Sequence, residues 1–298
     1  MTTSSCSLIG ESRYGTILRL DNDQFCNVIR WVGNGLRKTA VRSLTIEPNL
    51  ANNLTPDSTS GGVDWLENCG IKTRTTGTTR NREITIEDIH VARSDGLGVY
   101  LFGDDVHLRN SSLEAAVHDA AELCDGRGGT ITGCTVSIDN GASGYYSLGT
   151  DAFDDFQICD NLTIVRAGGA ITAAVHRLWP GNFRGAVNGN VIRCEPGGRI
   201  GAIFHAYSLL TTITGNSIQG HVDPGGWGTT KIDLNTSVLF TGNVASDCEF
   251  RTSVNSLGTV IPTIANGVTR VTQNILESCV PPPSNSQLVF TDNSEFFF

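Results

Sequence analysis

The stretch Ile213-Thr-Gly-Asn216-Ser-Ile218 decides the fold, because close variants of it recur along most of the chain. The shared pattern is an apolar residue, a polar one, a small or polar one, a turn residue, any residue, and a second apolar residue. The turn positions of the eight copies are Ile89, Ser111, Cys134, Asn161, Asn190, Asn216, Asn243 and Asn274. Neighbouring copies are 22 to 31 residues apart, and recurrence at such a period is typical of a solenoid.

The spacing predicts that each repeat is one coil of about three short strands joined by turns. The first apolar residue of each copy should point into the solenoid, since side chains alternate along a strand. Asn tolerates the left-handed conformation at the bend that follows. Stacked coils would bring these Asn amides together, so we predict a hydrogen-bonded ladder from Asn161 to Asn274, extended by Cys134, Ser111 and Ile89 as small or apolar fillers. The expected fold class is all-β, a right-handed parallel β-helix.

Further apolar segments complete the coils. The third strand of each coil is expected at 98–102, 121–124, 145–148, 170–174, 201–204 and 230–234, and segments 17–20, 28–32 and 43–46 predict earlier coils. We expect a single domain over residues 1–280, with a long surface excursion near 49–83 and a C-terminal tail or cap over 281–298. A β-sandwich or a propeller is the alternative. A sandwich would show turns every ~8–12 residues without one recurring Asn column, and propeller blades of ~40–45 residues are too long for this spacing.

The charge pattern narrows the partners. The formal net charge is −9 and no basic stripe is present, so we expect no nucleic-acid and no anionic-membrane partner. No apolar stretch approaches the ~20 residues that span a bilayer, and residues 1–6 show no signal-peptide pattern.

The cysteines and histidines give no ligand pattern. The nine Cys include no C-x-x-C pair, which predicts buried free thiols and fits assembly in a reducing cytosol. The six His lack metal-ligand spacing, so no metal and no cofactor are expected. An Asp-rich calcium site at Asp151, Asp154 and Asp155 is a minor alternative.

Three copies of the pattern, at 213–218, 187–192 and 84–89, resemble the pectate-lyase-like superfamily of right-handed parallel β-helices, as does the opening Ser7-Leu-Ile-Gly-Glu-Ser12 with Thr16-Ile-Leu18. Members include pectin and alginate lyases, polygalacturonase-type hydrolases, epimerases and phage tailspikes. The resemblance implies a polysaccharide partner, a virion or extracellular location, and a homotrimer as an assembly to test. The polygalacturonase motifs do not occur in order, and the tyrosine-centred motif of alginate epimerases is absent.

One carboxylate-rich segment, 118–125, is the best candidate for catalysis. Aligning Leu123 with Leu101 and Leu148 places Glu122 on the outward face of its strand, with Tyr100 on the coil before and Ser147 on the coil after. Carboxylates one coil apart could reach the ~5–9 Å separations used by glycosidases. We therefore expect Glu122 as general acid.

Other carboxylates would complete this site. Asp119 or Asp125 would be the nucleophile or base, with Asp95 in the equivalent turn one coil earlier. Cations are few nearby, at Arg93, Arg109 and Arg127, which favours hydrolysis over uronate elimination. The plain alternative is that these are solvated turn carboxylates.

Aromatic and polar residues would bind the sugar. Flat apolar faces suit sugar rings, and turn polar groups can fix hydroxyls. The expected substrate-binding residues are Tyr100, Tyr145, Tyr146, Trp179, Trp227 and His118. Alternatively, the Pro-Gly-Gly before Trp227 is only a turn and the indole covers the core.

Two functions remain open on this scaffold. One is a glycoside hydrolase or polysaccharide lyase, including a phage tailspike-type depolymerase. The other is a non-catalytic structural or receptor-binding β-helix of a virion or cell surface.

Overall fold

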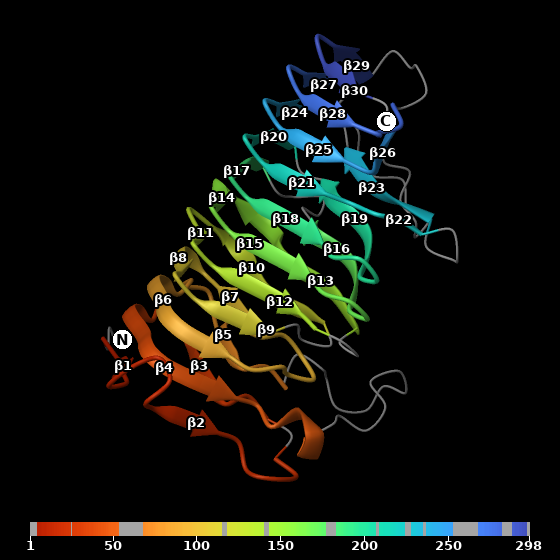
Figure 1. Cartoon of the computed structure of the whole chain (residues 1–298). Coiled ribbons are helices and arrows are strands. Elements are labelled where there is room, and N and C mark those ends of the chain that lie inside the picture. Colours follow the sequence, from red (N-terminus) through yellow and green to blue (C-terminus); the bar gives the residue numbers. More distant parts are fainter. Residues whose placement is uncertain are drawn as a thin grey trace, which may run out of the picture.

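The computed structural model describes residues 5–24, 26–53, 68–114, 118–139, 143–176, 183–206, 209–223, 228–234, 237–252, 268–281 and 288–296. Its strands form two sheets that wind into coils stacked along one axis, from β4 and β6 near the N-terminus to β29 and β30 near the C-terminus (Figure 1). The predicted class, an all-β parallel β-helix, is confirmed. Within the described residues, no helix is long and apolar enough to cross a membrane.

The larger sheet supplies two strands to most coils. Its twenty strands are β1 (Ser7–Ile9), β2 (Ile17–Arg19), β4 (Arg37–Glu47), β6 (Arg82–Val91), β8 (Asp104–Arg109), β9 (Ser112–Glu114), β11 (Thr130–Thr132), β12 (Thr135–Ile138), β14 (Phe156–Cys159), β15 (Leu162–Val165), β17 (Phe183–Asn188), β18 (Val191–Cys194), β20 (Leu209–Thr214), β21 (Ser217–Gln219), β24 (Val238–Thr241), β25 (Val244–Ser246), β27 (Thr269–Thr272), β28 (Ile275–Glu277), β29 (Leu288–Thr291) and β30 (Ser294–Phe296).

The smaller sheet supplies the third strand. Its ten strands are β3 (Ile29–Gly33), β5 (Ile71–Thr75), β7 (Val99–Phe102), β10 (Asp119–Arg127), β13 (Ser143–Asp154), β16 (Ala170–His176), β19 (Arg199–Ala206), β22 (Val222–Asp223), β23 (Gly228–Leu234) and β26 (Cys248–Thr252). All of these pair in parallel except β22, which is antiparallel to β23. The predicted third strands at 98–102, 121–124, 145–148, 170–174, 201–204 and 230–234 are therefore confirmed.

The predicted inward stack is also confirmed. Successive strands pair residue to residue along one line, and each member is fully buried: Ile86, Leu108, Ile131, Ile158, Val187, Ile213 and Phe240. Aromatic packing continues the core toward the C-terminus, where the rings of Phe240, Phe250 and Phe290 lie 5.5 and 5.6 Å apart by centroid. Because no coil can bury its apolar residues alone, this stack is what makes the coils mutually dependent.

The Asn ladder forms as predicted. The side-chain amide of each Asn donates to the side-chain oxygen of the Asn one coil on, at 3.0 Å from Asn161 to Asn190, 2.9 Å to Asn216, 2.9 Å to Asn243 and 3.1 Å to Asn274. All five are buried. The ladder starts at the backbone N–H of Cys134, which donates to Asn161, so buried polar groups are satisfied along the axis.

The C-terminal segment, expected as a tail or cap, adds a further pair of strands to the larger sheet. The ladder runs one coil further, since Asn274 donates to Asn293 at 2.8 Å. Strands β29 and β30 pair in parallel with β27 and β28. The repeat therefore continues beyond Pro281, and residues 282–287 lie outside the described residues.

The expected excursion at 49–83 is shorter than predicted within the described residues. A 3₁₀ turn covers Leu50–Asn52, and β5 then joins the ten-stranded sheet between β3 and β7. Residues 54–67 lie outside the described residues. The polar composition of this region concealed a strand whose outward positions are charged.

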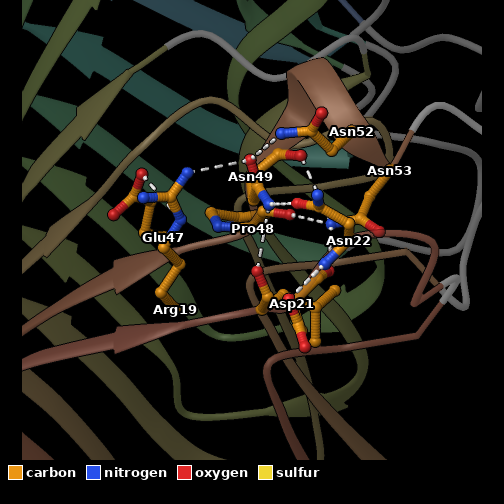
Figure 2. A network of polar contacts seen from close by, with 9 residues as sticks. Arg19, Asp21, Asn22, Glu47, Pro48, Asn49, Asn52 and Asn53 are labelled. Atoms are coloured by element: carbon orange, nitrogen blue, oxygen red, sulfur yellow. Dashed lines mark hydrogen bonds and ion pairs between the residues drawn. The ribbon is translucent and has the colours of Figure 1, made fainter.

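A compact amide network holds the turn before this 3₁₀ segment (Figure 2). Asn49 has a left-handed backbone (φ 57°), and its amide donates to Asn22 at 3.0 Å while its oxygen accepts from Arg19 at 3.2 Å and Asn52 at 2.8 Å. Asn53 donates to the backbone oxygen of Asp21 at 2.9 Å. The network joins the turn after β4 to the turn after β2, and so fixes the first coil.

Candidate functional site

The outer face of the ten-stranded sheet carries the candidate site, and a shared irregularity sets its geometry. In β10 both Ala120 and Ala121 contact the core, so two consecutive side chains point inward. The same holds for Ala174 and Val175 in β16. Ser147 of β13 also points inward, where its hydroxyl lies 3.1 Å from that of Thr163 on the opposite sheet. Each such doublet leaves outward positions three residues apart, as in a β-bulge.

Neighbouring strands share this doublet, so they stay in register until β23. Between β19 and β23 the pairing shifts, because Ala202 pairs with Lys231 but Phe204 pairs with Ile232. The outer face from β7 to β19 therefore presents two aligned columns of positions. The first column contains Asp119, Tyr146 and Ala173. The second column contains Tyr100, Glu122 and Gly149.

Glu122 lies in the second column and is buried, with 3% of its surface exposed. It pairs with Tyr100 on β7, as predicted, and with Gly149 on β13. The predicted neighbour Ser147 is wrong. The alignment of Leu123 with Leu148 was two residues out, because it ignored the doublet. The outcome is that Glu122 faces a residue without a side chain on one flank.

Lys72 extends the same column on the other flank. It pairs with Tyr100 from β5 and is also buried, with 2% exposed. Sequence reasoning missed it because it falls in the expected excursion. The alternation in Ile71-Lys-Thr-Arg-Thr75 after Gly70 was the available signal. A cation thus stands on this face, which weakens the argument that the region is poor in positive charge.

Tyr100 and Cys124 form a small apolar cluster on the outer face. Together with Cys69 and Leu97 they are buried away from the main core, and Phe102 packs against them. The Tyr100 hydroxyl donates to the Cys124 sulfur at 3.4 Å. Burial raises the pKa of the Tyr100 phenol far above its usual value, and the charges of Cys124 and Glu122 add to this effect. The phenol is therefore held in its proton-donating form.

Three potential acids converge beside this cluster. One oxygen each of Glu122 and Asp151 and the sulfur of Cys124 all lie within 4.8 Å of one another. Asp151 pairs with Cys124 from the next coil. Burial, and next the charge of Glu122, raise the pKa of the Cys124 thiol well above its usual value. Two carboxylates and a thiol are donors that can hold a metal ion, and such groups are also common without one.

Asp119 and His118 lie next to this group along the chain. Asp119 is buried at 3% exposed and pairs with Tyr146 in the first outward column. His118 is half-buried, and its backbone N–H donates to the oxygen of Gly96. The structure places Asp119 on the same face as Glu122, and His118 directly precedes β10.

Asp95 and Asp125 are placed differently. Asp95 is half-buried in the turn before β7 and accepts from the amide of Asn68 at 3.3 Å. Asp125 is exposed and pairs with Arg80 at 2.7 Å. Asp151, on the next coil, is the carboxylate that the structure brings within 4.8 Å of Glu122. The roles predicted for these residues stay predictions.

The structure places only some of the aromatic residues that were predicted to bind the sugar. Tyr146 is half-buried on β13, opposite Asp119 and Ala173. Trp179 and Trp227 lie outside the described residues, and only the backbone of Tyr145 is described.

A second titratable group lies further along the same sheet. Asp233 on β23 is half-buried between His205 and Arg251 in register. Burial raises the pKa of its carboxyl to about 6, and the charges of Arg251 and Lys231 partly oppose this. Sequence reasoning gave Asp233 only as part of a strand. A carboxylate between two apolar residues in Ile232-Asp-Leu234 was the signal.

These features define a class of protein: a parallel β-helix with a buried acidic cluster on the outer face of one sheet. Solved structures of other proteins share this fold. The chain is similar to the mannuronan C-5 epimerase A-module of Azotobacter vinelandii, with 14% identity over 97% of this chain and 83% of that chain, at a TM-score of 0.62.

Two further solved structures resemble it less. An alginate lyase from Paenibacillus shows 11% identity over 90% of this chain and 94% of its own, at a TM-score of 0.48. A DFA-IIIase from Arthrobacter chlorophenolicus shows 14% identity over 88% and 67%, also at 0.48. No family model and no curated protein matches the sequence.

Proposed function

We propose that the protein cleaves a polysaccharide over the outer face of β7, β10 and β13, with Glu122 as the general acid. The observation that carries the proposal is the approach of Glu122 and Asp151 within 4.8 Å on neighbouring coils. Retaining glycosidases hold their two carboxyl groups about 5–5.5 Å apart. Asp151 is then the nucleophile or the group that stabilises positive charge on the sugar.

The surroundings of Glu122 suit a proton donor. A carboxyl group in an apolar, water-poor setting favours its protonated form, which a general acid needs at neutral pH. The apolar side chains of Phe102 and Leu97 belong to the same outer cluster as Tyr100. A rigid sheet also holds both carboxyl groups at a fixed separation, which loops do less well.

Polysaccharide as substrate class has support from two sides. The repeat resembles a superfamily rich in polysaccharide-active enzymes, and the structure most fully matched above is named as an epimerase of mannuronan. The net charge of −9 neither favours nor opposes the binding of an uncharged glycan. The partner is thus inferred to be a glycan.

A uronate lyase is the second candidate, and Lys72 favours it. In elimination, a base removes the sugar C5 proton while a cation neutralises the uronate carboxylate. Lys72 and Tyr100 pair on the same outer column. This arrangement supplies a positive charge and a phenol beside Glu122, which the hydrolase mechanism does not require.

Product analysis on a panel of glycans tests both candidates. Alginates, pectates, fructans and bacterial surface polysaccharides are incubated with wild type, Glu122→Gln and Asp125→Asn. New reducing ends without ultraviolet absorbance indicate hydrolysis, whereas an absorbing unsaturated uronate indicates elimination. Cleavage of no glycan would favour the non-catalytic, receptor-binding alternative.

A tailspike-type depolymerase of a phage virion is the finer form of the proposal, and it rests on the sequence resemblance alone. A homotrimer is expected for that form. Light scattering after size exclusion tests for the homotrimer, since one chain has a mass of 31.8 kDa and a trimer would have three times that mass.

A further inference from the structure

The last coils contain two cysteines in neighbouring strands. Cys248 begins β26, and Cys279 lies one coil later, where Glu249 and Val280 form a parallel bridge. The backbone N–H of Val280 donates to the oxygen of Cys248 at 2.9 Å, and that of Phe250 donates to the oxygen of Val280 at 2.9 Å. This pattern sets Cys248 and Cys279 side by side in register.

The register of the two strands places the Cα atoms of Cys248 and Cys279 at a separation that suits a disulfide. Neighbouring parallel strands lie about 4.8 Å apart, and disulfides join residues whose Cα atoms are about 4.4–6.8 Å apart. Both side chains belong to the core, with 0% and 5% exposed. Because paired residues in parallel strands project to the same face, the two sulfurs meet inside the solenoid.

The two thiols are close enough to affect each other's ionisation: their interaction lowers the pKa of Cys279 and raises that of Cys248. Each sulfur also lies near a backbone oxygen, Cys248 at 3.1 Å from that of Ser246 and Cys279 at 3.5 Å from that of Ala245. Cys279 is therefore the thiol that ionises first. A bulkier residue beneath the pair is excluded, since a Cβ on Gly220 would lie 2.8 Å from the Cys248 sulfur.

We propose that Cys248 and Cys279 form a reversible disulfide that fastens the coil of β27 and β28 to the coil before it. Cys279 is 5% exposed and Cys248 is 0% exposed, so Cys279 is the less buried of the two. Cys134 differs because the equivalent residues of the neighbouring coils are Ser111 and Asn161, so no cysteine lies beside it.

The oxidant is a small disulfide such as oxidised glutathione. The Cys279 thiolate attacks one of its sulfurs, forming a mixed disulfide and releasing one glutathione thiolate. Cys248 then loses its proton to solvent and attacks the Cys279 sulfur, releasing the second glutathione. The two cysteines lose two electrons and two protons, and the glutathione disulfide gains them.

The test uses the full chain with exposed Cys6 and Cys26 replaced by Ser, which leaves seven thiols. After oxidation and removal of glutathione, the denatured protein should show five thiols. Trypsin separates Cys248 and Cys279 into peptides 232–251 and 271–298. Their disulfide-linked mass in the unreduced digest is the expected result, and it disappears after reduction.

Stability gives a second readout. A bond that closes a loop of this length should raise the unfolding midpoint of the oxidised protein by roughly 5 °C over the reduced protein. Cys279→Ser should abolish that difference, while Cys134→Ser should keep it. The linked peptides are detected without replacing Cys279 or Cys134, so the test still holds if either of those variants fails to fold. Seven thiols after oxidation, or glutathione retained on Cys279 alone, would overturn the proposal.

Discussion

Glu122 and Tyr100 are direct partners on the neighbouring parallel strands β10 and β7, and both side chains are buried although they point away from the core. The ten-stranded sheet thus has an apolar, water-poor patch on its outer face. Burying a carboxyl group in such a patch costs stability unless the group is hydrogen-bonded or paired. The proposed catalytic role is the reason we give for its presence.

Replacing Glu122 with Gln should reduce turnover on a cleaved glycan by roughly 100-fold or more, because the variant keeps the shape but cannot donate the proton. Fold and glycan binding should survive, as checked by circular dichroism and by titration calorimetry. Asp125→Asn is the matched control, since Asp125 is exposed and paired with Arg80. Equal losses in both variants would move the active site toward the far end of β10.

Asp151→Asn tests the proposed partner of Glu122. If Asp151 is the nucleophile, turnover should fall at least as far as in Glu122→Gln. Added azide should restore turnover only in variants that keep Glu122, as Asp151→Asn does. Asp154→Asn is the control, because Asp154 pairs with Arg184 at 2.9 Å on the surface. Full activity in Asp151→Asn would return the role to Asp119.

Asn216→Leu should lower the free energy of unfolding by about 1–3 kcal/mol, because Asn190 and Asn243 would each lose a buried partner. Denaturant unfolding measures the loss. Asn293→Leu is the comparison, as Asn293 is half-buried and ends the described ladder, so it should cost less. A larger cost at Asn293 would contradict the ladder as the source of stability.

Gly185→Ala should destabilise the protein by about 1–3 kcal/mol, since a Cβ there would lie 1.9 Å from the ring of Phe156. Gly185 and Phe156 are paired across β17 and β14. Adding Phe156→Leu to Gly185→Ala should recover part of the loss. A double-mutant cycle with no coupling would show that the ring moves aside freely.

Asp233 should make stability fall as pH rises from about 4 to about 6. Its pKa is raised to about 6 in the fold by burial, so the folded state keeps a proton that the unfolded chain releases earlier. Asp233→Asn should therefore stabilise the protein above pH 6, by on the order of 1–3 kcal/mol, and have little effect below pH 4. Asp292→Asn, on an exposed residue, is the control variant.

The stacking of the coils could be predicted because it repeats. Asn161 through Asn274 recur with apolar neighbours, so one coil predicts the next. The doublet Ala120-Ala121 could not be predicted, because two consecutive small apolar residues do not reveal which way each points. Because the doublet was not recognised, Ser147 was predicted as the neighbour of Glu122, whereas the neighbour in the structure is Gly149.

The candidate site was less predictable for a related reason. Tyr100 followed from the alignment of Leu123 with Leu101, whereas the approach of Asp151 to Glu122 depends on register between β10 and β13, which share no motif. Lys72 was hidden by the polar composition around β5. Partners across strands are set by three-dimensional stacking, which local patterns do not encode.

Coil length and ladder geometry are independent in this protein. The ladder amides remain 2.8–3.1 Å apart, although the chain between successive Asn residues varies from 19 residues after Asn274 to 31 residues before it. Each turn can therefore lengthen or shorten without rephasing the coils above and below it. Evolution or an engineer could exchange the loops bordering the outer face one at a time, and so change the surface that the proposed glycan would meet, while the scaffold is inherited intact.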